Sequence, residues 1–159
     1  MKTPNLKKSK SLVILKKEVE ETLKNTIKIN KQNQKLLALW AADCAEHVLP
    51  YFEKEYPKDD RPRKAIEVGR AWVRSGKPMV MKEIRTAALD AHAAARNAPD
   101  NSAARAAARS AGQAVATAHV VGHALGAAIY ALKVAEAENI ADEREWQYQC
   151  LLKNLRLIN

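Results

Sequence analysis

The sequence predicts an all-α fold, a compact domain of about five to seven helices packed as helical hairpins. Its 159 residues are enough to bury one core. Alanine is concentrated in residues 101–137, where it fills 15 of 37 positions. β-branched residues are sparse and do not alternate with polar residues over a useful length, so strands are disfavoured.

The first third of the chain predicts two helices. Apolar residues near helical spacing indicate a helix from Ser11 to about Ile29. Polar Asn30–Gln34 is expected to be a connection. A second helix is expected over Leu36–Tyr56, with a disturbance at Pro50, because proline lacks a backbone donor and disfavours helix at the preceding residue.

The middle of the chain contains clear start and stop signals. Asp59-Asp60-Arg61-Pro62 is typical of a helix start, with an aspartate capping free amides and a proline in the first turn. That helix should run to about Arg74 and end at the turn Ser75–Pro78. The next helix is expected over Met79–Ala98, ending before Pro99.

The alanine-rich segment should begin with Asp100 or Ser102 as its cap. A straight helix over residues 102–138 would be about 55 Å long, whereas a domain of this size is about 40 Å across. We therefore expect a break near His119–Gly122. A last helix is expected over about Asp142–Arg156.

The positive charge lies mainly at the beginning of the chain. Residues 1–35 hold ten lysines and three glutamates, whereas residues 36–159 hold 17 basic and 15 acidic residues. We divide the chain into a basic N-terminal arm or helix, 1–35, and an all-helical domain, 36–159. The arm could bind nucleic acid nonspecifically, but the nearly neutral body is atypical of a nucleic-acid reader.

Compartment signals favour the cytoplasm. Cys44 and Cys150 lie far apart and do not suggest a disulfide framework. Leu12–Leu15 is too short for the core of a signal peptide. Residues 110–132 are long enough to span a membrane, but alanine, glycine and two histidines make a poor span, so no membrane association is expected.

Sequence motifs for catalysis are missing. The chain has no G-x-G-x-x-G, no Walker A motif, no H-E-x-x-H and no G-x-S-x-G. We therefore predict no enzyme, no catalytic residue and no cofactor. His119 and His123 are four residues apart, a spacing found in zinc sites on helices, but that argument requires an unbroken helix.

Semi-polar residues recur at helical spacing on three segments. Arg105, Arg109, His119 and His123 would form one stripe, and His92 and Arg96 belong to another. Trp40, Asp43 and His47 align on a third. We expect Asp43 or Glu46 to pair with Arg96 or Arg109, within either a buried structural network or a polar groove. Arg105 and Arg109 would favour an anionic partner.

Two packing features complete the expectations. Gly122-x-x-x-Gly126 is expected to allow close helix packing. The three tryptophans, Trp40, Trp72 and Trp146, are expected to anchor the core. Alanine and glycine surfaces could also pack between subunits, so a homodimer is one of the alternatives.

Several phrases carry a resemblance to a known family. They are LALWAADCAEHVLPYFE, DDRPRKAIE, AHAAAR, AARAAARSAGQAVATAHVV, GHALGAAIYALK and EREWQ. Together, over roughly Leu36–Leu157, the chain resembles an immunity-protein-like all-helical family of bacterial toxin–immunity systems. The resemblance implies a cytoplasmic protein that binds and neutralises a cognate protein toxin without catalysis.

Nine residues are the candidates for partner or ligand binding. The alternative to an immunity protein is a helical binding module that holds a ligand or metal in a groove lined by histidine and arginine. The candidate residues are Asp43, His47, Asp60, Arg63, His92, Arg96, Arg109, His119 and His123.

Overall fold

The computed structural model describes residues 17, 21, 31–75, 81–135 and 140–156. The expected helix over residues 11–29 lies outside these residues, apart from the helical positions Lys17 and Glu21. All regular structure within the described part is helical, which confirms the predicted fold class. The elements are α2 (Lys31–Val48), α3 (Pro50–Glu53), α4 (Arg61–Arg74), α5 (Met81–Asn97), α6 (Ala103–Ala116), α7 (His123–Ala135) and α8 (Ile140–Arg156).

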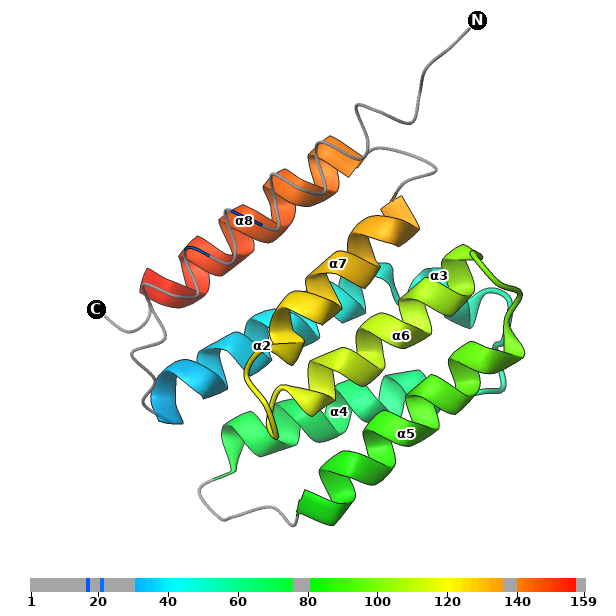
Figure 1. Cartoon of the computed structure of the whole chain (residues 1–159), viewed down its shortest axis with the longest axis horizontal. Helices are drawn as coiled ribbons and strands as arrows, with labels where there is room; N and C mark the ends of the chain where they lie inside the picture. Colours follow the sequence, from blue (N-terminus) through cyan, green and yellow to red (C-terminus); the bar gives the residue numbers. More distant parts are fainter. Residues whose placement is uncertain (1–16, 18–20, 22–30, 76–80, 136–139, 157–159) are drawn as a thin grey trace, which may run out of the picture.

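Helix α6 lies at the centre of the fold and packs against α2, α3, α4, α5 and α7 (Figure 1). Helices α5, α6 and α7 form one layer. Helices α4 and α2 lie beneath it, and α8 packs along α2 and α7 at the side. One side of α6 therefore faces the core, and a stripe along its other side remains partly exposed between α5 and α7.

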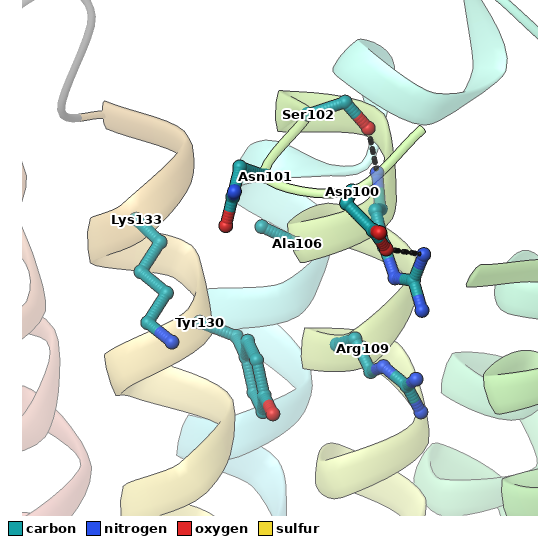
Figure 2. Close-up of a pocket in the computed structure, with 8 residues that line it drawn as sticks. Asp100, Asn101, Ser102, Ala106, Arg109, Tyr130 and Lys133 are labelled. Atoms are coloured by element: carbon teal, nitrogen blue, oxygen red, sulfur yellow. Dashed lines mark hydrogen bonds and ion pairs between the residues drawn. The ribbon is translucent and has the colours of Figure 1, made fainter. Parts of the chain in front are cut away.

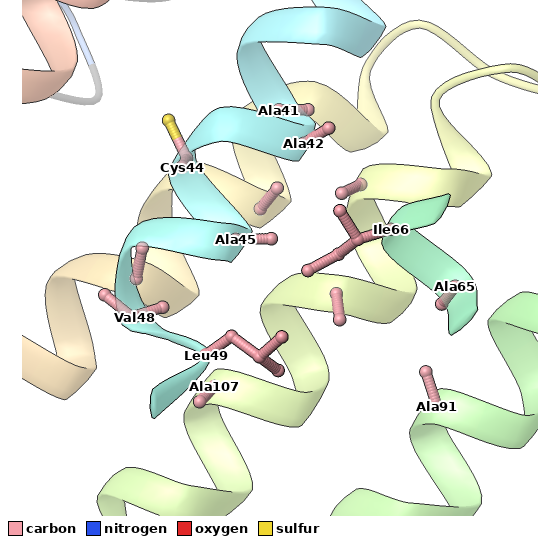
Figure 3. Close-up of a cluster of buried hydrophobic side chains, with 14 of the residues drawn as sticks. Ala41, Ala42, Cys44, Ala45, Val48, Leu49, Ala65, Ile66, Ala91 and Ala107 are labelled. Carbon is pink, nitrogen blue, oxygen red and sulfur yellow. The ribbon is translucent and has the colours of Figure 1, made fainter. Parts of the chain in front are cut away.

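The alanine content allows this close packing. Ala107, Ala108 and Ala111 of α6 are fully buried, so neighbouring helices approach its backbone closely. Figure 3 shows larger side chains, Leu49 and Ile66, filling the space beside such alanines. The alanine-rich segment is therefore part of the buried core of the fold. Within the described residues, no helix combines the length and apolar content that crossing a bilayer requires.

Most of the predicted helix boundaries are confirmed. Helix α2 ends at Val48 and α3 starts at Pro50, as the missing proline donor requires. Ser102 caps α6, because its Oγ accepts a hydrogen bond from the backbone N–H of Arg105 at 3.1 Å. At α4, the carboxylate of Asp59 accepts a hydrogen bond from the Arg61 N–H at 3.2 Å.

The break in the alanine-rich segment is also confirmed. Helix α6 ends at Ala116 and α7 begins at His123, so residues 117–122 form a linker rather than a helical turn. The two helices then pack against each other as a hairpin. Because of this break, His119 lies in the linker and His123 begins α7.

One predicted connection is wrong. Asn30–Gln34 was expected to be a loop, yet α2 begins at Lys31. The Gln34 Nε2 donates hydrogen bonds to the carbonyls of Thr117 and Ala118, at 3.1 and 3.2 Å. These carbonyls belong to the first two residues after α6. Gln34 therefore binds the chain at the end of a helix, 83 residues away in sequence. Its polar side chain does not indicate a loop at its own position. The domain boundary expected between residues 35 and 36 falls inside α2.

Candidate functional site

Eight of the nine candidate residues divide between two surfaces. Asp43, His47 and Arg63 lie on the side of α2, α4 and α8, whereas the remaining histidines and arginines lie around the exposed stripe of α6. Asp60 belongs to neither surface. It is exposed at the start of α4, where its carboxylate pairs with Lys64 at 3.0 Å.

On the first surface, Arg70 of α4 neutralises the acidic residues of α2. Its guanidinium lies 2.9 Å from the Asp43 carboxylate and 2.6 Å from that of Glu46. The expected pairing of these acids with Arg96 or Arg109 is therefore wrong. The physical reason is that α4 lies directly beside α2, whereas Arg96 and Arg109 belong to the other layer.

A second arginine completes this network. Arg63 donates two hydrogen bonds to the Glu53 carboxylate, at 2.8 and 2.7 Å, and lies 3.6 Å from Glu46. The hydrogen bonds from Arg63 lower the pKa of Glu53 below its usual value. Arg63 therefore pairs with carboxylates of its own chain.

His47 connects α2 to α8. Its Nδ1 lies 2.9 Å from the buried Glu143 carboxylate, and its ring stacks on Trp146 with centroids 3.8 Å apart. Trp146 is therefore a half-buried partner of His47 at the edge of the core. Of the three tryptophans, Trp40 alone is completely buried; its Nε1 donates to the Gln147 carbonyl at 2.9 Å.

The cysteines lie in this same region. The Cys150 thiol is 3.6 Å from the Asp43 carboxylate, to which it donates a weak hydrogen bond. Burial first and Asp43 second raise the pKa of Cys150 to about 11. Burial also raises the pKa of Cys44, which is fully enclosed. Both thiols are therefore protonated and unreactive at neutral pH.

The second surface is a groove along α6, which we call the α6 groove. Its floor is the partly exposed stripe of α6 that includes Arg105, Ala106, Arg109 and Gln113. From α5, His92 contacts Arg109 of this stripe, and Arg96 lies one helical turn after His92. From α7, His123 contacts Gln113, and Tyr130 and Lys133 line a cavity beside α6.

His92 and Arg109 meet in the α6 groove. The His92 Nδ1 lies 3.1 Å from the Arg109 Nη1, and the ring lies over Gly112. Burial first, and then the charges of Arg109 and Arg96, lower the pKa of His92. A neutral imidazole follows, whose Nδ1 accepts the hydrogen bond from Arg109 without supplying a counter-charge.

A second polar pair lies further along the groove. The Nδ1 of His123 is 2.7 Å from the Gln113 Oε1, and this amide lies over Gly126. Burial, and then the charge of His119, lowers the pKa of His123. Because Gly126 has no side chain, it leaves room for the amide of Gln113. Gly122 is different, because it has open space around it, so the expected close packing holds for one glycine of the pair.

The arrangement of His119 and His123 does not support a metal site. His119 lies exposed in the linker and His123 begins α7, so the two do not share a helix face. Within the described ranges, no group of three histidine, cysteine, aspartate or glutamate residues is placed to hold a metal ion. His119 instead stands at the end of the α6 groove.

In the part of the chain that the structure describes, two arginines of the α6 groove have no carboxylate partner. Arg96 is exposed and Arg109 contacts a neutral histidine. Among the described residues, the exposed large hydrophobic side chains are Leu89 and Val120, at 67% and 50% exposure. Leu89 precedes His92 by one helical turn, and Val120 lies in the linker beside His119. This mixture of cations and exposed apolar side chains is typical of a binding surface.

A cavity of about 470 Å³ lies at the end of the α6 groove near the start of α6. Its lining comes from the start of α6 and from α7 (Figure 2): Asp100, Asn101 and Ser102 before α6, Arg105, Ala106 and Arg109 of α6, and Tyr130 and Lys133 of α7. The Lys133 Nζ lies 4.9 Å from the centre of the Tyr130 ring. Lys133 is not among the nine candidate residues, although its position three residues after Tyr130 places both on one helix face.

Comparison with known proteins identifies the family. A family model described as "Imm-5 like putative immunity protein" matches residues 27–154. The chain belongs to this family. The match confirms the resemblance and begins at residue 27 rather than 36. No curated protein sequence and no solved structure matches the chain significantly.

Proposed function

We propose that this member of the Imm-5 like family is a non-catalytic, cytoplasmic immunity protein that binds one cognate toxin and thereby neutralises it. The α6 groove is the surface that makes the contact. The observation that carries the proposal is that Arg109 and Lys133 line its cavity without a carboxylate partner among the described residues.

The contrast between the two surfaces supports this choice. On the α2 and α4 side, Asp43, Glu46 and Glu53 are each held by an arginine of the same chain. Such pairs satisfy one another and leave little for a partner to gain. In the α6 groove, Arg96 and Arg109 have no carboxylate partner among the described residues, so a partner that supplies one gains favourable electrostatic energy.

The chemistry of the groove supports binding rather than catalysis. His92 and His123 have lowered pKa values, and their ring nitrogens contact Arg109 and Gln113. Among the described residues, the hydrogen-bond partners of these imidazoles include no serine, cysteine or carboxylate, so neither imidazole forms a nucleophile–base pair with them. The cysteine thiols lie on the other surface with raised pKa values.

The test has two stages. Tagged full-length protein is first used to capture its partner from cells that produce the toxin, in about 0.3 M salt, where charge interactions are screened beyond a few ångströms. The captured protein is then expressed in a sensitive host with and without the immunity protein. We expect growth to be restored and a one-to-one complex to be purified.

The second stage also tests the non-catalytic mechanism. Toxin released from the complex with denaturant and refolded should regain its activity with an unchanged mass. Inactivation by substoichiometric protein, or a covalent change in the toxin, would show that the protein acts as an enzyme. Absence of protection by a stoichiometric complex would contradict the proposed function.

A further inference from the structure

The cavity at the end of the α6 groove contains two cations that have no carboxylate partner among the described residues. Arg105 is neutralised, because its Nη1 contacts the Asp100 carboxylate and the Ala98 carbonyl. Arg109 contacts neutral His92, and Lys133 lies over the Tyr130 ring. Within residues 31–75, 81–135 and 140–156, Arg109 and Lys133 therefore place two positive charges without carboxylate partners at the cavity.

The other walls suit a side chain that is polar only at its tip. Ala106 forms an apolar floor between α6 and α7, and the Tyr130 ring projects into the cavity beside Lys133 (Figure 2). The first turn of α6 also directs its positive end toward this region. At about 470 Å³, the cavity lies in the range of about 300–1,000 Å³ that is usual for binding pockets.

We propose that this cavity receives a glutamate or aspartate side chain of the toxin, with its carboxylate between Lys133 and Arg109 and its methylene groups against Ala106 and Tyr130. This inference rests on the proposed function and specifies which part of the α6 groove contacts the toxin. It implies that the toxin presents an acidic patch to a basic groove.

The first arm of the test uses hexaglutamate peptide as the probe and amide NMR of the full-length protein as the readout. We expect saturable shifts at the amides of Ala106, Tyr130 and Lys133. Lys133→Glu should weaken binding at these amides about tenfold, and Arg109→Gln should weaken it severalfold. Lys153→Glu, which reverses an exposed lysine on α8, is the matched control and should leave these isotherms unchanged.

Residue-specific shifts separate the cavity from the lysine-rich arm, which could also bind the peptide. Shifts confined to residues 1–30 would overturn the proposal. Equal weakening by Lys133→Glu and Lys153→Glu would overturn it as well. Inorganic phosphate is the third probe: if it binds the cavity amides as tightly as hexaglutamate, the cavity is a site for free anions rather than for a protein side chain.

The second arm uses the captured toxin. Lys133→Glu and Arg109→Gln should each reduce its affinity about tenfold or more, and Lys153→Glu should not. A toxin that is neutralised equally well by all three variants would overturn the inference and leave the proposed function intact. If no toxin is neutralised at all, the proposed function fails, and the hexaglutamate arm still decides whether the cavity binds carboxylates.

Discussion

The imidazole of His92 lies directly over Gly112, with ring atoms 2.8 Å from the point where a Cβ would stand. Because no real contact is that short, Gly112→Ala must push the ring out of the α6 groove. We expect the pKa of His92 to rise toward its usual value, since burial is the main cause of its depression. Two-dimensional NMR of the imidazole signals against pH measures this change.

The matched control for that substitution is Gly69→Ala. A Cβ on Gly69 would meet Val115 at 3.5 Å and beyond, which is ordinary contact. Both substitutions add about 1 kcal/mol of helix propensity, so the difference between them isolates the displaced imidazole. A titration curve of His92 that is identical in the two variants would contradict the proposed steric role of Gly112.

The stability of the fold should decrease as the pH falls below about 6.5. The pKa values of His92 and His123 are lowered in the folded protein, whereas unfolded histidines titrate near 6.5. The unfolded state therefore takes up protons first, and protonation favours unfolding. We expect a melting temperature several degrees lower at pH 5.2 than at pH 7.5, measured by circular dichroism.

The acidic groups with lowered pKa values do not contribute to the loss of stability in this pH range. Glu53 and Asp59 titrate below their ordinary values because of hydrogen bonds from Arg63 and Arg61, so they stay ionised above pH 5. His92→Gln should remove part of the pH dependence. A melting temperature that is constant or rises on acidification would show that neither groove histidine is held in its neutral form.

Local signals in the sequence were sufficient for most helix boundaries, but not for the start of α2 at Lys31. Pro50 interrupts the first described helix, and the break after Ala116 follows from the length of a straight helix compared with the size of the domain. The first feature depends on neighbouring residues, and the second depends only on the length of the segment. The repeating positions of His92 and Arg109 were likewise readable as stripes on single helices.

Pairing between helices could not be predicted in the same way. Asp43 and Glu46 have several arginines to choose from, and the packing of α4 beside α2 selects Arg70. No local pattern in the sequence specifies which helices are neighbours. For the same reason, Asp43 was expected to meet Arg96 or Arg109, whereas the structure places it on the other surface with Arg70.

Alkylation of Cys150 should be slow and should depend on Asp43. Burial and the neighbouring carboxylate raise the pKa of this thiol to about 11, so its thiolate fraction at pH 8 is on the order of a hundredfold below that of a free cysteine. Iodoacetamide labelling followed by mass spectrometry should show this delay. Asp43→Asn should speed the reaction, because it removes the negative charge next to the thiol.

Burial remains in that variant, so the rate should stay below that of the urea-unfolded chain, which serves as the reference. Cys44 is fully enclosed and should be labelled after Cys150 in both proteins. Labelling of folded Cys150 at the rate of the unfolded chain would contradict the contact between its thiol and Asp43.

Gln34 should contribute to stability through the end of α6 rather than through α2. Its amide donates to the carbonyls of Thr117 and Ala118, which would otherwise end the helix without protein partners. Gln34→Ala should cost about 1–2 kcal/mol, since two hydrogen bonds in a partly buried place are lost. For a chain of this size that corresponds to a melting temperature lower by about 3–8 °C.

Gln149→Ala is the matched control, because Gln149 is exposed and its amide bonds Glu145 within the same helix. It should change the free energy of unfolding by less than about 0.5 kcal/mol. Hydrogen exchange adds a readout of location, since amides near residues 117–122 should exchange faster in Gln34→Ala and not in the control. Equal stability losses in the two variants would mean that the link between α2 and the α6 terminus contributes nothing specific, and the long-range reason for the helical start at Lys31 would fail.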